Sequence, residues 1–202
     1  MIPLAALLLV PAALRAEDWP EFRGPTGQGI STEKNLPIRW SESENITWKQ
    51  PIPGRGWSSP SIAGGQIWIT AAVDDDTSLR AICLDQKSGK ILHNVEPFTF
   101  DEAPPVHRKN THASPTPVIE KDRVYVHFGT LGTACLSTSG EVIWKTQELV
   151  YNHRHGPGGS PVIYEDLLVI SCDGTDVQFV VALDKQTGKI RWRTDRDGKM
   201  AY

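Results

Sequence analysis

Histidine and arginine side chains concentrate in two short segments of this 202-residue chain. Four of the six histidines lie there: one segment holds His107, Arg108, Lys109 and His112, and the other holds His153, Arg154 and His155. Histidine together with aspartate binds metal ions, and arginine binds carboxylates or phosphates. Aspartates that can join them stand at Asp74, Asp75, Asp76, Asp173 and Asp176. No metal-type spacing such as H-x-x-x-H on one element is present, so the pattern assigns no metal ligand.

Three side chains stand shortly before a recurring Ser-Pro dipeptide. Trp57 precedes S-S-P, His112 precedes A-S-P, and His155 precedes G-P-G-G-S-P, the dipeptides being Ser59-Pro60, Ser114-Pro115 and Ser160-Pro161. Arg55 lies two residues before Trp57. We take Arg55, Trp57, His112 and His155 as the candidate binding residues. The plain alternative for each is a polar residue of a solvated loop.

A short sequence unit occurs three times and indicates which strands position these side chains. It reads A-L-D-K-Q-T-G-K-I-R-W around Gly188, C-L-D-Q-K-S-G-K-I-L-H around Gly89, and C-L-S-T-S-G-E-V-I-W around Gly140. The glycine supplies the positive φ of a tight hairpin, and the preceding Asp or Ser accepts hydrogen bonds from the turn. A large ring follows four residues after each glycine, at His93, Trp144 and Trp192. We expect these rings to pack between neighbouring sheets.

A strand with an unbroken apolar run lies upstream of each unit, starting at Gln66, Arg123 and Leu167. Such runs suit strands that are covered on both faces. Four strands in each repeat of about 50 residues predict an all-β fold, a β-propeller of four-stranded antiparallel blades. We expect about three blades, near residues 57–96, 111–147 and 156–195. The alternative is three unrelated hairpins in a β-sandwich.

The propeller prediction explains why the candidate residues belong together. Inner strands line the central channel, so the residues that enter them converge at its mouth. A polar and aromatic rim around a central depression is a place where such a fold holds a ligand.

The pattern D-x-x-T-G-K-x-x-W at Asp184–Trp192 resembles the pyrroloquinoline-quinone (PQQ) repeat. The resemblance covers residues 45–202 and implies a fold first. The family includes quinoprotein alcohol dehydrogenases and a non-catalytic propeller lipoprotein of outer-membrane β-barrel assembly. For the dehydrogenases it implies bound PQQ with calcium, a carboxylate base and an indole stacked on the quinone. No residue here matches those roles one by one, and a vicinal Cys-Cys pair is missing from this sequence.

The N-terminal residues 1–16 predict a signal peptide. The apolar run from Ile2 to Leu14 is too short to span a bilayer, and cleavage fits after Ala16. An amphipathic or core segment is the alternative. We therefore expect export to the periplasm or the extracellular space and no transmembrane segment.

Residues 17–44 are rich in Gly and Pro and lack a period, so we expect an irregular leader over the outside of the propeller, with Trp19 and Phe22 as anchors. Residues 45–48, N-I-T-W, are typical of one orphan outer strand. Its partner strands are expected after Tyr202, which predicts that the sequence is an N-terminal fragment of a larger propeller.

Composition narrows the function classes. The net charge of −3 and the lack of a dense basic cluster argue against nucleic acid as a partner. The three cysteines, Cys83, Cys135 and Cys172, are expected to be buried free thiols.

The sequence thus predicts a binding or interaction scaffold that holds a protein or a small molecule at one propeller face. The alternative is a quinoprotein oxidoreductase that oxidises an alcohol or a sugar with PQQ. A third reading is a propeller hydrolase or lyase with a histidine-based metal centre.

Overall fold

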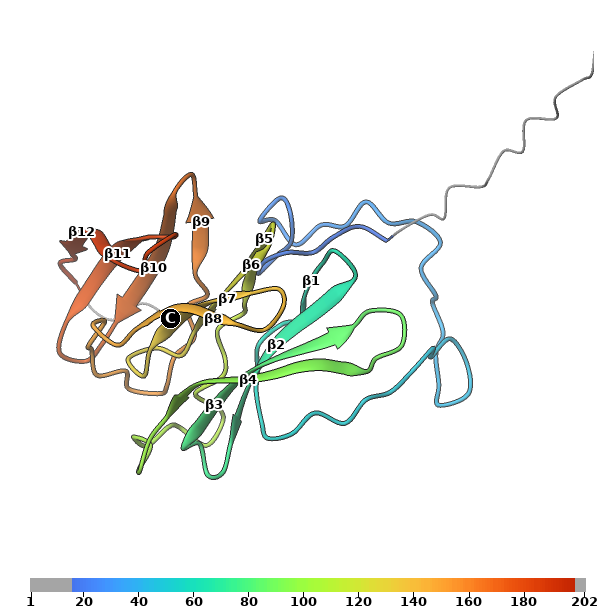
Figure 1. Cartoon of the computed structure of the whole chain (residues 1–202), viewed down its shortest axis with the longest axis horizontal. Helices are drawn as coiled ribbons and strands as arrows, with labels where there is room; N and C mark the ends of the chain where they lie inside the picture. Colours follow the sequence, from blue (N-terminus) through green and yellow to red (C-terminus); the bar gives the residue numbers. More distant parts are fainter. Residues whose placement is uncertain (1–15, 199–202) are drawn as a thin grey trace, which may run out of the picture.

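Three four-stranded antiparallel sheets make up the protein (Figure 1). The structure is a computed structural model that describes residues 16–198 and contains twelve strands and no helix in that range. The predicted signal peptide lies outside the described residues except for Ala16. Within residues 16–198 the structure has no apolar helix of membrane-spanning length.

Each sheet is a simple meander of consecutive strands. The first contains β1 (Ser61–Ala63), β2 (Gln66–Val73), β3 (Ser78–Asp85) and β4 (Ile91–Thr99). The second contains β5 (Val118–Glu120), β6 (Arg123–His127), β7 (Thr133–Ser137) and β8 (Val142–Thr146). The third contains β9 (Val162–Tyr164), β10 (Leu167–Asp173), β11 (Gln178–Asp184) and β12 (Ile190–Asp195). The all-β propeller fold with four-stranded antiparallel blades is confirmed.

The repeated glycine turn, which we call the corner, joins the third and fourth strands of each blade. Gly89, Gly140 and Gly188 all have positive φ, at 70°, 90° and 73°. The preceding side chain accepts backbone hydrogen bonds as predicted: the Asp85 carboxylate from the Ser88 N–H at 2.7 Å, and the Ser137 hydroxyl from the Glu141 N–H at 3.0 Å. Side chains that satisfy turn amides hold each corner in a fixed shape.

An aromatic ring from the preceding segment covers each corner glycine. The Trp144 ring lies where a Cβ on Gly188 would meet it at 2.5 Å, and its indole N–H donates to the Lys185 carbonyl at 3.0 Å. Trp48 covers Gly89 in the same way, with its N–H 3.1 Å from the Gln86 carbonyl. The His93 ring covers Gly140. Only glycine leaves room for these rings, so the corners lock neighbouring blades together.

The small residues of the repeat stand directly across from these rings. Cys83 is opposite His93, Cys135 opposite Trp144, and Ala182 opposite Trp192 in the strand register. All three cysteines are buried and free, as predicted. Burial, with the nearby Asp85 carboxylate, raises the pKa of the Cys83 thiol to about 12, so this thiol stays protonated at neutral pH.

Residues 45–48 differ from the prediction of an outer strand. They form no strand, and the nearest pairing is an isolated bridge between Ser41 and Glu44. Among the described residues no strand lies beside them to complete a ladder. Trp48 nevertheless covers Gly89 as Trp144 covers Gly188, although the strand predicted for residues 45–48 is absent.

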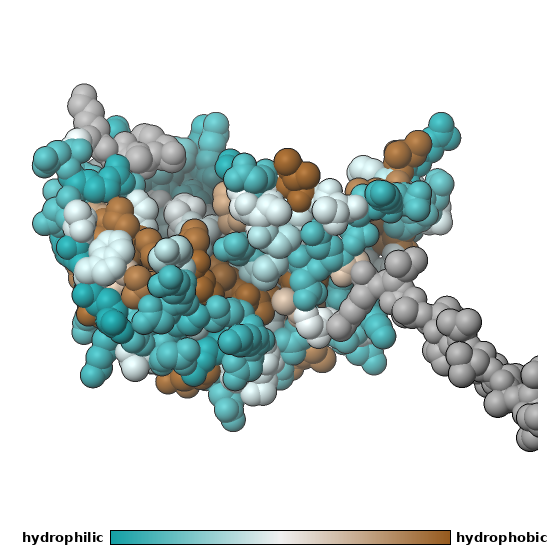
Figure 2. All heavy atoms as spheres, turned by 90° about the horizontal axis from the view of Figure 1, so that it is seen from above, coloured by the Kyte–Doolittle hydropathy of each residue, from teal (hydrophilic) through white to brown (hydrophobic). Residues whose placement is uncertain are grey.

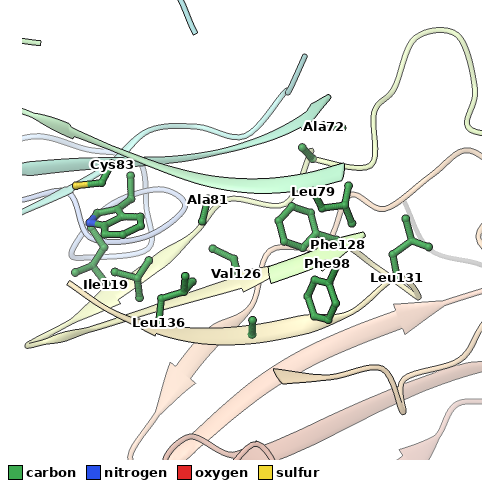
Figure 3. Close-up of a cluster of buried hydrophobic side chains, with 14 residues drawn as sticks. Ala72, Leu79, Ala81, Cys83, Phe98, Ile119, Val126, Phe128, Leu131 and Leu136 are labelled. Carbon is green, nitrogen blue, oxygen red and sulfur yellow. The ribbon is translucent and has the colours of Figure 1, made fainter. Parts of the chain in front are cut away.

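The blades pack face to face through two clusters of buried side chains. The cluster between the first two blades includes Trp68, Leu79, Phe98, Phe128 and Leu136 (Figure 3). The cluster between the second and third includes Tyr125, Leu149, Leu168 and Phe179. The middle strands of the second blade, β6 and β7, contribute to both clusters because both of their faces are covered, and this explains the apolar run of β6.

The leader takes a different path from the expected one. Trp19 exchanges two backbone hydrogen bonds with Ile62 of β1, at 2.7 and 2.8 Å, and the Ile119 N–H of β5 donates to the Pro20 carbonyl at 2.8 Å. The start of the leader, residues 19–20, therefore lies against the inner strands rather than over the outside (Figure 1). Trp19 is an anchor, whereas the Phe22 side chain is 50% exposed. Unpaired edges of β1 and β5 attract the leader, since each offers free backbone groups.

Hydrophobic side chains also reach the surface on the face seen in Figure 2, between polar regions. Large apolar side chains that are exposed within residues 16–198 include Leu36, Ile38, Trp40, Trp57, Val150 and Tyr164.

Candidate functional site

The chain enters each inner strand through a linker, namely residues 49–60, 100–117 and 147–161. These linkers meet in a line of hydrogen bonds that crosses the three blades. The Ser59 N–H donates to the Thr116 hydroxyl at 3.1 Å, and the Thr116 N–H donates to the Ser160 hydroxyl at 3.0 Å. We call the surface that the three linkers form the linker face.

This line of hydrogen bonds corrects the alignment of the Ser-Pro dipeptides. β1 begins two residues after Ser59 and β9 two residues after Ser160, while β5 begins at Val118, two residues after Thr116. Thr116-Pro117 is therefore the equivalent dipeptide in the second blade, and Ser114-Pro115 is not. A threonine hydroxyl accepts a hydrogen bond as a serine hydroxyl does, so the hydrogen bond is preserved although the residue type differs.

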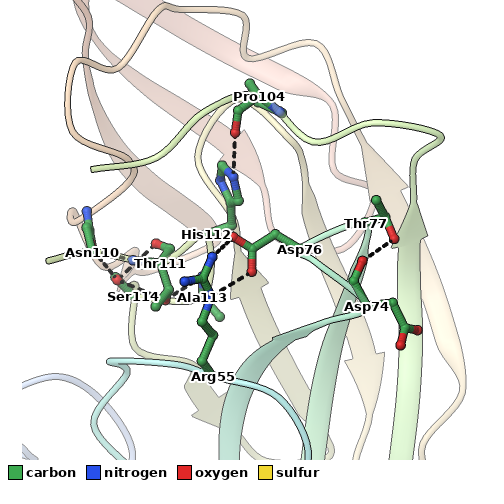
Figure 4. A network of polar contacts seen from close by, with 10 residues as sticks. All are labelled: Arg55, Asp74, Asp76, Thr77, Pro104, Asn110, Thr111, His112, Ala113 and Ser114. Carbon is green, nitrogen blue, oxygen red and sulfur yellow. Dashed lines mark hydrogen bonds and ion pairs between the residues drawn. The ribbon is translucent and has the colours of Figure 1, made fainter. Parts of the chain in front are cut away.

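Arg55 forms an ion pair inside the protein. Its guanidinium donates to both carboxylate oxygens of Asp76, with Nε–Oδ1 at 3.0 Å and Nη2–Oδ2 at 2.5 Å (Figure 4). The Asp76 side chain is only 6% exposed, so the pair holds a buried carboxylate. The hydrogen bond and the charge of Asp76 raise the pKa of Arg55. A two-pronged pair of this kind fixes the linker to the loop between β2 and β3.

Trp57 projects from the same linker into solvent, with 67% of its side chain exposed. Its backbone is nevertheless fixed, because the N–H groups of Trp57 and Ser58 both donate to the Ala113 carbonyl, at 3.0 and 3.2 Å. A cavity of about 400 Å³, which we call the first pocket, opens beside it. Its lining includes Arg55, Trp57, Arg108, Asn110 and Thr111.

His112 lies beneath the linker face rather than on it. Its ring is fully buried, and Nε2 lies 2.9 Å from the Pro104 carbonyl, which fixes Nε2 as the protonated nitrogen (Figure 4). Burial lowers the pKa of His112, so its imidazole is neutral at pH 7. In this position it supports the second linker and has no exposed atom to offer to a ligand.

His155 is half-buried in the third linker. Its carbonyl accepts hydrogen bonds from the Asn110 side chain at 3.0 Å and from the His107 N–H at 3.3 Å. The two imidazoles, His107 and His155, meet edge to face with ring centres 5.1 Å apart. His155 lines a cavity of about 530 Å³, the second pocket, with Tyr151, His153, Arg154 and Asp173.

Asn110 connects the two pockets and was not anticipated from the sequence. Its amide donates to the carbonyls of His155 and Pro157, at 3.0 and 3.1 Å, and its side-chain oxygen accepts from the Thr111 N–H at 2.9 Å and from the Ser114 hydroxyl at 2.5 Å. It lines both pockets. Asn110 has no counterpart in the other linkers, so no repeat marks it.

The four candidate residues therefore do not form one ring. Arg55 and Trp57 share the first pocket, His155 lies in the second, and His112 is buried and lines neither. A ligand-binding role for them remains a prediction. The structure adds His153, which is 8% exposed and has no hydrogen-bond partner for either ring nitrogen within the described residues.

The residues present do not fit the calcium and quinone that the resemblance implies for dehydrogenases. In residues 16–198, no group of three or more His, Cys, Asp and Glu side chains is placed to hold a metal ion. Trp57, the indole at the rim, is largely exposed rather than stacked in a closed site. The described part of the chain thus supplies no calcium ligand set.

Sheets that meet face to face through ring-covered corners, with linkers gathered at one end, define a β-propeller of PQQ-type blades. A family model described as outer membrane protein assembly factor BamB matches residues 30–149 and 129–201. The chain belongs to this family.

Solved structures agree at the level of the fold. BamB from Moraxella catarrhalis has 17% sequence identity and a TM-score of 0.51, over 76% of this chain and 43% of that chain. Quinohemoprotein alcohol dehydrogenase ADHIIG from Pseudomonas putida HK5 has 18% identity and a TM-score of 0.54, over 73% of this chain and 22% of that chain. A europium-containing methanol dehydrogenase has 17% identity and a TM-score of 0.51, over 69% and 24%. The chain thus spans less than half the length of each.

A search of curated proteins finds no significant match.

Proposed function

We propose that this chain is an exported, protein-binding scaffold that holds a polypeptide partner at the linker face. The observation that carries the proposal is Trp57, whose indole is 67% exposed on a fixed backbone at the edge of the first pocket. Tryptophan and arginine are the residues that most often dominate the binding energy of protein interfaces. Here Trp57 stands beside Arg55 and Arg108 in one pocket lining.

Rigidity of the linker face supports the same function. The Arg55–Asp76 pair, the Ala113 carbonyl and the Asn110 side chain hold the linkers in place before any ligand arrives. A preorganised surface loses little conformational entropy on binding, which increases affinity.

The family suggests the process in which the partner takes part. The matching family model is described as an outer membrane protein assembly factor, and we infer that the partner takes part in the same process. Export through the predicted signal peptide, residues 1–16, brings the chain to the compartment where that process occurs.

The alternative of a PQQ-dependent oxidoreductase rests on likeness of fold to the dehydrogenases. Adding PQQ and calcium to the full-length protein and measuring dye-linked alcohol oxidation separates the two functions. We expect no activity, because the described residues supply no calcium ligand set.

The proposal is tested by placing a photo-cross-linking amino acid at position 57 of the full-length protein in the cells that make it. Trp40 provides the matched control position, since it is also a tryptophan with 67% exposure but lies in the leader. We expect position 57, and not position 40, to capture a component of outer-membrane protein assembly. Equal capture at both positions, or none at position 57, contradicts the proposal.

A further inference from the structure

The second pocket indicates which kind of side chain the partner places there. It lies between the third linker and the end of β10, and it has a volume of about 530 Å³. Tyr151 and Pro157, both buried, contribute to its walls, and His153 and Arg154 are consecutive residues of its lining. The pocket is large enough for one amino-acid side chain with space to spare.

Positive charge around this pocket is not balanced. No Asp or Glu occurs from Ala103 to Ile119 or from Leu149 to Tyr164. Asp173, which also lines the pocket, is paired with Arg196 at 2.9 Å. Arg154 is exposed, and the structure gives it no ion pair or hydrogen bond with any described residue. Its guanidinium is therefore available to a carboxylate.

His153, the neighbour of Arg154, presents no polar atom to the open space of the pocket. The residue is 8% exposed, and both of its ring nitrogens are buried. Its ring packs near those of His112 and Tyr151, with ring centres 6.1 and 5.7 Å apart. His153 therefore forms part of the inner wall, and Arg154 is the side chain of this pair that can reach a ligand.

We propose that the second pocket binds an Asp or Glu side chain of the polypeptide partner, with its carboxylate held by Arg154. The assignment rests on the proposed function. Asn110 lines both pockets, so a short extended segment can place an apolar residue against Trp57 and an acidic residue in the second pocket. Arginine pairs well with a planar carboxylate, which favours an acidic side chain as the occupant.

The test uses the full-length protein and two fluorescein-labelled peptides, five repeats of Gly-Glu and five repeats of Gly-Gln. We expect fluorescence anisotropy to show binding of the Gly-Glu peptide alone. Arg154→Gln should weaken it about tenfold, since a charge-assisted hydrogen bond is lost. Arg39→Gln is the control, because Arg39 is an exposed arginine of the leader.

Several outcomes overturn this assignment. Equal affinity for the two peptides, an unchanged affinity in Arg154→Gln, or binding to phosphatidylglycerol vesicles without binding to the peptide would each do so. If position 57 captures its partner while Arg154→Gln has no effect on the peptide, the proposed function stands and the pocket assignment fails. If the peptide binds through Arg154 while position 57 captures nothing, the pocket assignment stands and the proposed function fails.

Discussion

The corners and the linkers of this protein are built on opposite principles. At each corner a ring covers a glycine of positive φ, and the device at Gly89, Gly140 and Gly188 is nearly the same. The linkers differ in length, and each carries its own polar contacts, such as the Arg55–Asp76 pair in the first and Asn110 in the second. Repetition at the corners secures the stacking of blades, which leaves the linkers free to differ.

A side chain added at a corner glycine should cause the largest loss of stability. Gly188→Ala places a Cβ 2.5 Å from the Trp144 ring at a φ of 73°. We expect a loss of about 3 kcal/mol in the free energy of unfolding, because the substitution adds a steric clash to the left-handed backbone. The measurement is urea denaturation of the full-length protein.

Gly64→Ala is the matched control for that substitution. Gly64 also has a positive φ, 60°, but a Cβ there meets nothing within 4 Å. Gly64→Ala should lower the free energy of unfolding by only about 1 kcal/mol, which is the cost of the left-handed backbone alone. Equal losses for the two variants would show that ring packing on Gly188 does not stabilise the corner.

We expect a smaller loss of stability at acidic pH, and we expect it to come from buried histidines rather than from the corners. Burial lowers the pKa of His127, the last residue of β6, from 6.5 to about 3, and His153 of the third linker adds to this shift. Burial also lowers the pKa of His112 and His153. Between the two pKa values these histidines bind protons in the unfolded chain but not in the folded chain. Their contribution to the free energy of unfolding is therefore largest above pH 6.5 and decreases as the pH falls below it. For His127 alone we expect a loss of about 2 kcal/mol at pH 5.

The corners should not contribute to that loss. The Ser88 hydroxyl and N–H groups lower the pKa of Asp85 from 3.8, so its contribution declines only when the pH falls below 3.8. Urea midpoints at pH 7 and pH 5 check the prediction. His127→Gln should reduce the difference between them, and the exposed His107→Gln should preserve it. Identical midpoints at the two pH values in the unmodified protein would refute it.

The corners could be predicted from the sequence because their interactions are local. The Asp85–Ser88 hydrogen bond spans three residues, and the glycine between strand three and strand four stands at a fixed place in each repeat. A ring also stands four residues after each of these glycines, at His93, Trp144 and Trp192. Fold class, strand order and the free buried cysteines follow from this short-range pattern.

The linkers resisted prediction because their interactions are long-range. Arg55 meets Asp76 across 21 residues, and Asn110 meets the His155 carbonyl across 45. The sequence located the candidate residues in the right loops but did not show that His112 turns inward to Pro104. The S-P-T-P run at Ser114–Pro117 offered two dipeptides, and only the strand start at Val118 distinguishes them.

We propose that the linkers bind the partner while the corners hold the fold. Hydrogen–deuterium exchange of the full-length protein, with and without the Gly-Glu peptide, distinguishes these two roles. We expect the peptide to slow exchange in residues 106–112 and 151–159 and to leave residues 85–90, 137–141 and 184–189 unchanged. Slower exchange at the corners, with none at the linkers, would contradict it.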